Sequence, residues 1–242
     1  MTPPPVIDLN ADVGERPGSA GIALDAAIIA AVSSLNVACG FHAGDAETMR
    51  AVCEIAVAKR KCLGAHVSYL DREGFGRRDR EVEPEVLREH IAQQIRALRI
   101  TATAARGTVL YVKPHGALYN RAAVDRSCAE AIADAIASVD SELKLLGPPG
   151  SRLLAAAAAH GLEAFAEGFP DRGYRADGTL MPRGEPGAVL EHAAAVEQAQ
   201  RLADQGRVRS LCIHSDTPDA AELAVSVRNR LIGGGFQIRP FA

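Results

Sequence analysis

Short apolar runs alternate with longer helix-like stretches along the whole chain, and this alternation restricts the fold more than any other feature. Such a pattern is typical of β–α–β units built around a parallel sheet. Seven successive units favour a distorted (β/α)7 barrel of the α/β class, with an open doubly wound sheet as the alternative. The predicted strands are Val6–Leu9, Leu35–Cys39, Cys62–Ala65, Thr108–Lys113, Leu143–Leu146, Leu162–Ala166, Val208–Ile213 and Phe236–Ile238.

Local signals mark the ends of the helices that follow these strands. Asp45 can cap the second helix, Thr217 with Pro218 opens the last one, and Gly161 follows a helix that ends at His160. The predicted helices are Asp25–Ser33, Ala46–Lys61, Glu83–Ala105, Asp125–Ser138, Arg152–His160, Ala188–Asp204 and Pro218–Ile232.

Length and composition favour one enzyme-sized domain. The 242 residues fit a single β/α-barrel domain over 1–242, and 48% hydrophobic residues with a net charge of -3 give no bulk case for nucleic-acid binding. No signal-peptide pattern or membrane-spanning apolar run is present in the sequence. Five cysteines without a CxxC pair indicate reduced thiols and a cytoplasmic protein.

Titratable side chains recur where predicted strands end. In a β/α barrel these ends converge on one mouth, where catalytic groups gather, so the pattern predicts an enzyme. The residues in question are His42, His66, His115 and His214, with an acidic group formed by Asp8, Asp12 and Glu15 after the first strand.

Some of these residues have the chemistry of a divalent-metal site. Asp12, His42 and His66, with Asp8 nearby, offer imidazole and carboxylate ligands from three successive strand ends. A hydrogen-bonded acid–base network without a metal explains the same residues equally well. The sequence leaves both interpretations open.

Two further segments carry charge to the same mouth. Lys113 and His115 in KPHG supply a cation and a proton-transfer group, although a strand-end salt bridge also explains Lys113. His214-Ser215-Asp216 is not read as a serine triad, because adjacent strand residues point to opposite sides.

The two long loops 68–81 and 168–187 are predicted to overhang the mouth as lids or binding loops. Arg77 and Arg78 in the first, and Asp171 with Arg172 in the second, could bind a carboxylate or phosphate, with solvated loop charges as the alternative.

Taken in order, several motifs resemble the LamB/YcsF family from Ile7 to Pro218. They are IDLNADVGE, NVACGFHAGD, GAHVSY with GFGRR, VKPHGALYN, EGFPDRGYRADGTLMPR and CIHSDTP. The resemblance implies a barrel related to sugar-deacetylase folds. It also implies ATP-dependent opening of the lactam of 5-oxo-L-proline to L-glutamate, together with two further subunits, B and C. A metal-dependent amidase or deacetylase working without ATP is the alternative, and a non-catalytic binding subunit is a third.

The residues that match the motifs divide into two predicted groups. Activation of water is assigned to an Asp12/His42/His66/His115 cluster, and Lys113 completes the catalytic set. The predicted substrate-binding residues are Asp8, Asn10, Glu15, Arg77, Asp171, Arg172, His214 and Asp216.

Ser215 departs from the pattern that the resemblance implies, which has glycine at this position. The substitution is expected to place a side chain beside the ligand path.

Overall fold

Parallel strands form a closed barrel in the computed structural model, which describes residues 3–217 and 219–242. The strand order is β2-β3-β4-β5-β6-β7-β1, and β1 also pairs with β2, which closes the ring. The predicted barrel is therefore confirmed, and the open-sheet alternative is wrong. The strands are β1 (Val6–Val13), β2 (Ser34–Ala38), β3 (Cys62–Val67), β4 (Val109–Pro114), β5 (Lys144–Gly147), β6 (Ala164–Gly168), β7 (Ser210–Ile213) and β8 (Gln237–Ile238), the last added beside the start of β1.

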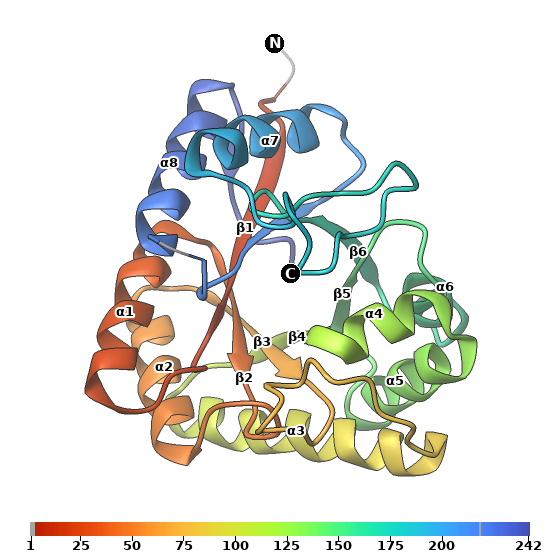
Figure 1. Cartoon of the computed structure of the whole chain (residues 1–242). Coiled ribbons are helices and arrows are strands. Elements are labelled where there is room, and N and C mark those ends of the chain that lie inside the picture. Colours follow the sequence, from red (N-terminus) through yellow and green to blue (C-terminus); the bar gives the residue numbers. More distant parts are fainter. Residues whose placement is uncertain (1–2, 218) are drawn as a thin grey trace.

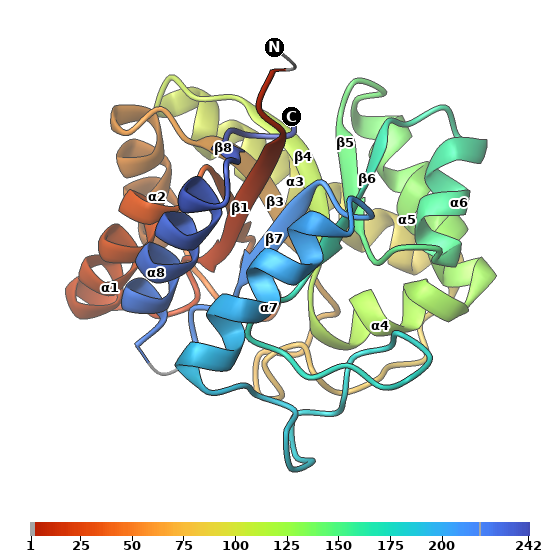
Figure 2. The same ribbon diagram turned by 90° about the horizontal axis from the view of Figure 1, so that it is seen from above.

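Helices surround the barrel, as Figures 1 and 2 show from two directions. Their bounds are α1 (Gly18–Ala31), α2 (Ala46–Ala58), α3 (Pro84–Ala104), α4 (Gly116–Val124), α5 (Arg126–Val139), α6 (Arg152–Ala159), α7 (His192–Asp204) and α8 (Ala220–Gly233). Over the described residues, none of these helices is long and apolar enough to cross a membrane.

Two predicted helix ends are confirmed and a third is not. The Asp45 carboxylate accepts a hydrogen bond from the Thr48 backbone N–H at 2.8 Å, and Gly161 follows α6 with a φ of +73°. α8 begins only at Ala220, after Asp219, and the Thr217 hydroxyl bonds elsewhere. Pro218 lies outside the described residues.

Other boundaries differ from prediction. α1 begins at Gly18, before the predicted Asp25, and α7 begins at His192, after the predicted Ala188. The sequence does not predict α4, because only His115 separates it from the end of β4 and the KPHG segment is expected to end a strand.

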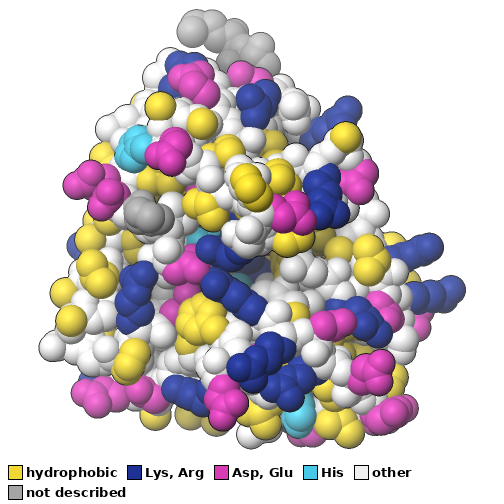
Figure 3. All heavy atoms as spheres, viewed as in Figure 1, with side chains coloured by type: hydrophobic (Ala, Val, Ile, Leu, Met, Phe, Trp, Pro, Cys, Tyr) yellow, Lys and Arg dark blue, Asp and Glu magenta, His cyan; other side chains and the backbone are white. Residues whose placement is uncertain are grey.

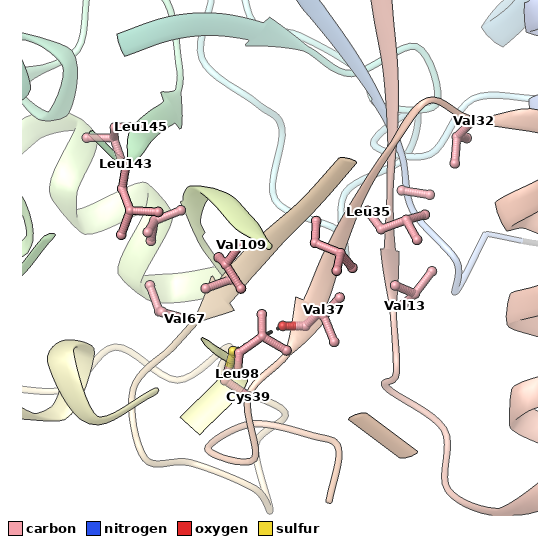
Figure 4. Packing of buried hydrophobic residues seen from close by; sticks show 14 of the residues in the cluster. Val13, Val32, Leu35, Val37, Cys39, Val67, Leu98, Val109, Leu143 and Leu145 are labelled. Atoms are coloured by element: carbon pink, nitrogen blue, oxygen red, sulfur yellow. Dashed lines mark hydrogen bonds between the residues drawn. The ribbon is translucent and has the colours of Figure 1, made fainter. Parts of the chain in front are cut away.

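β1 is four residues longer than predicted, because its two faces meet different surroundings. Asp8, Asn10 and Asp12 point into the barrel, where Asn10 bonds Asn36 of β2 and Ser210 of β7. The intervening residues of β1 point outward into the apolar layer beneath the helices, part of which is drawn in Figure 4. A polar inner face made a buried strand look like a loop in the sequence.

Apolar side chains close the end of the barrel at which the strands begin, here called the barrel base. Tyr111, Phe165 and Phe241 form it with Cys62 and Leu146. The Phe241 ring lies 4.9 Å from that of Tyr111 and 5.1 Å from that of Phe165, between centroids. The last residues of the chain therefore plug the barrel opposite the mouth.

Candidate active site at the barrel mouth

Lys113, at the end of β4, is a buried cation at the centre of the mouth. Its Nζ lies 3.1 Å from Glu167 Oε2, 3.4 Å from Asp12 Oδ1 and 2.9 Å from Cys212 Sγ. Burial alone would lower the pKa of Lys113, but Asp12, Cys212 and Glu167 hold it well above its ordinary value. Lys113 therefore stays an ammonium ion that faces the cavity described below.

Asp12 is the carboxylate partner that β1 brings to this cation. Its Oδ1 accepts a hydrogen bond from Asn36 Nδ2 at 2.7 Å and lies 3.3 Å from His66 Nε2. Burial opposes ionisation, yet His66 and Lys113 keep the pKa of Asp12 well below its ordinary value. The structure thus brings together Asp12, His66 and Lys113, as predicted.

Three imidazoles and a carboxylate converge beside Asp12. We term Glu15, His42, His66 and His115 the histidine cluster; each offers one ligand atom, and these atoms lie within 4.8 Å of one another. Burial lowers the pKa values of His42 and His115 well below normal, and it raises that of Glu15. The cluster could hold a metal ion, with Glu15 and His115 joining the predicted His42 and His66 and with Asp12 alongside.

The first long loop packs directly on the histidine cluster. His115 Nε2 donates to the Phe75 carbonyl oxygen at 2.9 Å, and Phe75 and Gly76 have φ values of +54° and +65°. A Cβ on Gly76 would lie 2.2 Å from Ser68 Oγ, so only glycine fits there. The predicted position of this loop over the mouth is therefore confirmed.

His214, at the end of β7, is oriented by a carboxylate from the second long loop. Its Nδ1 lies 3.0 Å from Asp171 Oδ2, which also accepts from the Thr217 hydroxyl at 2.7 Å. Burial would raise the pKa of Asp171, but His214 and these hydrogen bonds keep it below normal. With Nδ1–H donated to Asp171, Nε2 of a neutral His214 is a proton acceptor.

Asp216 lies beside His214 in sequence but serves different residues. It pairs with Arg77 at 2.5 Å and with Arg183 at 3.0 Å, and so holds one arginine from each long loop over the mouth. Burial opposes the ionised form, while Arg77 and Arg183 keep the pKa of Asp216 below normal. His214 and Asp216 therefore have different partners, and both follow the end of β7 at Ile213, so the segment is not the strand that the sequence argument assumed.

These groups surround a cavity of about 320 Å³. Figure 3 shows Lys and Arg side chains gathered around a hollow near the centre of this face. Buried Arg172 is fixed by the carbonyl oxygens of Ala188 at 3.0 Å and Met181 at 2.6 Å. The chemically active residues that line the cavity are Asp12, His66, Arg77, Lys113, His115, Tyr119, Arg172, Arg183 and His214.

Sequence reasoning missed Arg183 and Tyr119. Arg183 was one charge among several in its loop, and its position became clear only from its pairing with Asp216. Tyr119 belongs to the KPHGALYN motif, and its buried hydroxyl has no hydrogen-bond partner among the described residues. A polar group left free beside a cavity is available to a ligand.

Asp8 and Asn10 lie deeper in the barrel than the cavity. Asp8 accepts hydrogen bonds from Ser33, Ser34 and Ser210, and burial raises its pKa to about 6. Asn10 Oδ1 lies 3.3 Å from Lys113 Nζ, so it supports the cation from below. Arg78 points away, toward Asp71 and Glu73.

Comparison with known proteins assigns the chain to a family. The LamB/YcsF family model matches residues 7–242. The chain belongs to the LamB/YcsF family. The 5-oxoprolinase A subunit of Streptomyces avermitilis is 49% identical to this LamB/YcsF chain over 98% of it and 100% of the relative.

Solved structures agree with this assignment. The lactam utilization protein from Thermus thermophilus is 36% identical and superposes with a TM-score of 0.89, over 98% of this LamB/YcsF chain and 100% of that protein. The catalytic domain of a peptidoglycan N-acetylglucosamine deacetylase from Eubacterium rectale is 12% identical with a TM-score of 0.55, over 99% and 89% of the two chains. The second likeness concerns the fold alone and bears out the predicted deacetylase-like barrel.

Proposed function

We propose that this chain is the A subunit of an ATP-dependent 5-oxoprolinase, which converts 5-oxo-L-proline, ATP and water into L-glutamate, ADP and phosphate. The observation that carries the proposal is the full-length similarity to a 5-oxoprolinase A subunit and to a lactam utilization protein. The family match from residue 7 to residue 242 supports a single-domain chain. Five free, buried cysteines support a cytoplasmic location.

The cavity has the charge that an anionic lactam requires. Arg172 and Arg183 approach it from the second long loop, and Arg77 approaches it from the first. Guanidinium groups pair well with carboxylate or phosphoryl oxygens. We assign these three arginines to the substrate carboxylate and to phosphoryl oxygens.

The inner wall supplies groups for breaking an amide bond. Lys113 offers a fixed positive charge to the lactam oxygen, where negative charge develops as the carbonyl carbon is attacked. His214, oriented by Asp171, can take a proton from the attacking water and pass one to the departing ring nitrogen. Tyr119 offers its free hydroxyl to the same ligand.

ATP supplies a phosphoryl group to the lactam oxygen, which makes the carbonyl carbon a better electrophile. Water adds to that carbon, the ring C–N bond breaks with protonation of the nitrogen, and a second water cleaves the resulting acyl phosphate to glutamate and phosphate. The relatives are named as one lettered subunit of an enzyme, which implies further subunits, and we propose that B and C complete it. The residues of this chain then bind the lactam, neutralise its oxygen and transfer protons.

A metal-dependent amidase working without ATP is the second candidate, favoured by the histidine cluster. Glutamate release from 5-oxoproline, measured for the chain alone and with the B and C subunits, with and without ATP, separates the two. The 5-oxoprolinase proposal predicts turnover only when ATP and all three subunits are present. Turnover by the chain alone without ATP would establish the amidase instead.

A further inference from the structure

The histidine cluster contains lone pairs that face one another. The Nδ1 atom of His66 lies 3.1 Å from the carbonyl oxygen of Lys113. Because a carbonyl oxygen only accepts hydrogen bonds, this Nδ1 must carry the proton. In the neutral ring, Nε2 of His66 then presents a lone pair to the interior of the cluster.

A second carbonyl oxygen fixes His115 in the same way. Its Nε2 donates to Phe75 at 2.9 Å, so its Nδ1 carries a lone pair. That Nδ1 lies 3.0 Å from Nε2 of His66. Two neutral rings held in this way would repel each other, and Nε2 of His66 would also repel the Asp12 carboxylate 3.3 Å from it. A positive species, either a proton or a metal ion, therefore belongs between these groups.

The surrounding acceptors favour a metal ion over a proton. Glu15 Oε1 lies 3.7 Å from His115 Nδ1 and 3.3 Å from His42 Nε2. A proton links one donor to one acceptor, whereas a metal ion accepts all four ligands at once. Tetrahedral bonds of about 2.0–2.1 Å place ligand atoms ~3.3 Å apart. Three pairs are already separated by 3.0, 3.3 and 3.7 Å and all four atoms lie within 4.8 Å, so binding needs a small contraction and a turn of the His42 ring, which stacks on that of His115.

Charge and unsatisfied groups point the same way. At the inner wall of the mouth, the buried carboxylates Asp12, Glu15 and Glu167 outnumber the ammonium ion of Lys113, so a divalent cation would offset the local excess of negative charge there. The buried Nδ1 of His42 has no hydrogen-bond partner among the described residues, whereas backbone carbonyl oxygens fix the rings of His66 and His115. The His42 ring is therefore able to turn toward a bound ion.

We propose that the histidine cluster binds one divalent transition-metal ion through His42, His66, His115 and Glu15. Imidazole with carboxylate suits zinc, cobalt, manganese or iron. The carbonyl oxygens of Lys113 and Phe75 orient two of the imidazoles from behind, as outer partners of metal-binding histidines do. Use of the ion in lactam opening rests on the proposed function, whereas its binding does not.

The test is a titration of the whole chain after treatment with a chelator. Co²⁺ and then Zn²⁺ are added, and bound metal is measured by equilibrium dialysis with elemental analysis. We expect one ion per chain, a visible Co²⁺ absorption band of low-symmetry coordination, and a higher unfolding temperature in the loaded protein. Retention of neither ion at millimolar concentration would overturn the proposal and leave a shared proton between His66 and His115.

Variants locate the ion. His115→Ala should weaken Co²⁺ binding about 100-fold or more, and Glu15→Gln, which keeps the side-chain shape, should weaken it by at least about 10-fold. His160→Gln changes an exposed histidine at the end of α6 and is the matched control, expected to bind as the parent chain does. Binding that survives both His115→Ala and Glu15→Gln would contradict the assignment.

These readouts need neither 5-oxoproline, ATP nor the other subunits. Failure of the proposed function therefore cannot imitate failure of the cation site. A chain that binds the ion but shows no lactam turnover in the complete enzyme would contradict the proposed function alone.

Discussion

The same strands carry apolar side chains at one end of the barrel and charged side chains at the other. At the barrel base, Tyr111, Phe165 and Phe241 pack into an apolar plug. At the mouth, the same β4 presents Lys113 to carboxylates, and its last residues lead into His115. Along this one strand, the side chains at the base are held by apolar packing, and those at the mouth are held by ion pairs and hydrogen bonds. The base contributes stability, while the mouth accepts strained, costly groups for chemistry.

The largest effect is expected from Lys113→Met at the mouth. The change removes the positive charge at the lactam oxygen and leaves Glu167 and Asp12 without their buried counterion. Glutamate release should fall by about 10³-fold or more, and the free energy of unfolding should drop by roughly 3–5 kcal/mol.

Lys144→Met is the matched control for that change. Lys144 pairs with Glu163 on the surface at 3.4 Å. Surface pairs of this kind contribute little, so turnover should be unaffected. Equal losses in the two variants would mean that the position of Lys113 carries no special chemistry.

At the barrel base, Phe241→Ala should cost stability and leave catalysis intact. The ring fills space between Tyr111 and Phe165, and its loss opens a cavity. We expect the free energy of unfolding to fall by about 3 kcal/mol in urea titrations, with kcat/KM of the folded enzyme unchanged. A drop in kcat/KM comparable to that of Lys113→Met would break the division between base and mouth.

Between the two ends, Asp8 should make stability depend on pH. Burial raises its pKa from the ordinary value of 3.8 to about 6. Its protonated form stabilises the fold below the unfolded pKa, and this contribution disappears as pH rises through about 6. The free energy of unfolding of Asp8→Asn, measured relative to that of the parent chain, should therefore increase by up to roughly 3 kcal/mol as the pH rises from about 4 to about 8.

Urea unfolding of the two chains across that range measures the difference. A difference that does not change with pH would show that Asp8 is ionised at no cost in the folded chain, held by its three serines.

A smaller effect is expected from Arg183→Ala at the rim. Loss of one guanidinium beside the cavity should lower kcat/KM about 10- to 30-fold, mainly through KM, because one charge-assisted contact to the substrate is removed. Arg175→Ala in the same loop, where Arg175 pairs with exposed Glu185, should have little effect. A KM that stays constant in Arg183→Ala would move the anion site to Arg77 and Arg172.

Some features of the fold and of the site can be predicted from the sequence, and others cannot. The alternation of apolar and helix-like stretches predicts the strands. It also predicts that Asp12, His66 and Lys113 meet at one mouth, because the strand ends of a barrel converge whatever the details of packing. It could not extend β1 past Leu9, since polar residues inside a barrel imitate a loop.

Contacts between distant segments were also beyond the sequence. Asp171 and His214 are 43 residues apart and meet only through the fold. The imidazoles of His66 and His115 are fixed by the backbone carbonyl oxygens of Lys113 and Phe75. Every residue has such an oxygen, so the residue types do not predict these contacts. The sequence does not show the roles of Arg183 and Tyr119 for the same reason.

The smallest effect is expected from Ser215→Gly. The resemblance predicts that the Ser215 side chain lies beside the ligand path, but Ser215 does not line the cavity and its hydroxyl donates to Glu15 Oε2 at 3.3 Å. Its loss should change kcat/KM by less than about threefold, since one long hydrogen bond to a carboxylate is removed. A large gain in activity would show that the side chain does obstruct a ligand.

The most direct test of the account is glutamate release from 5-oxoproline by this chain assembled with the B and C subunits, with ATP present or withheld. The account predicts turnover that requires ATP, is lost in Lys113→Met and is retained in Phe241→Ala. Turnover that continues without ATP, or that Lys113→Met leaves unchanged, would contradict it.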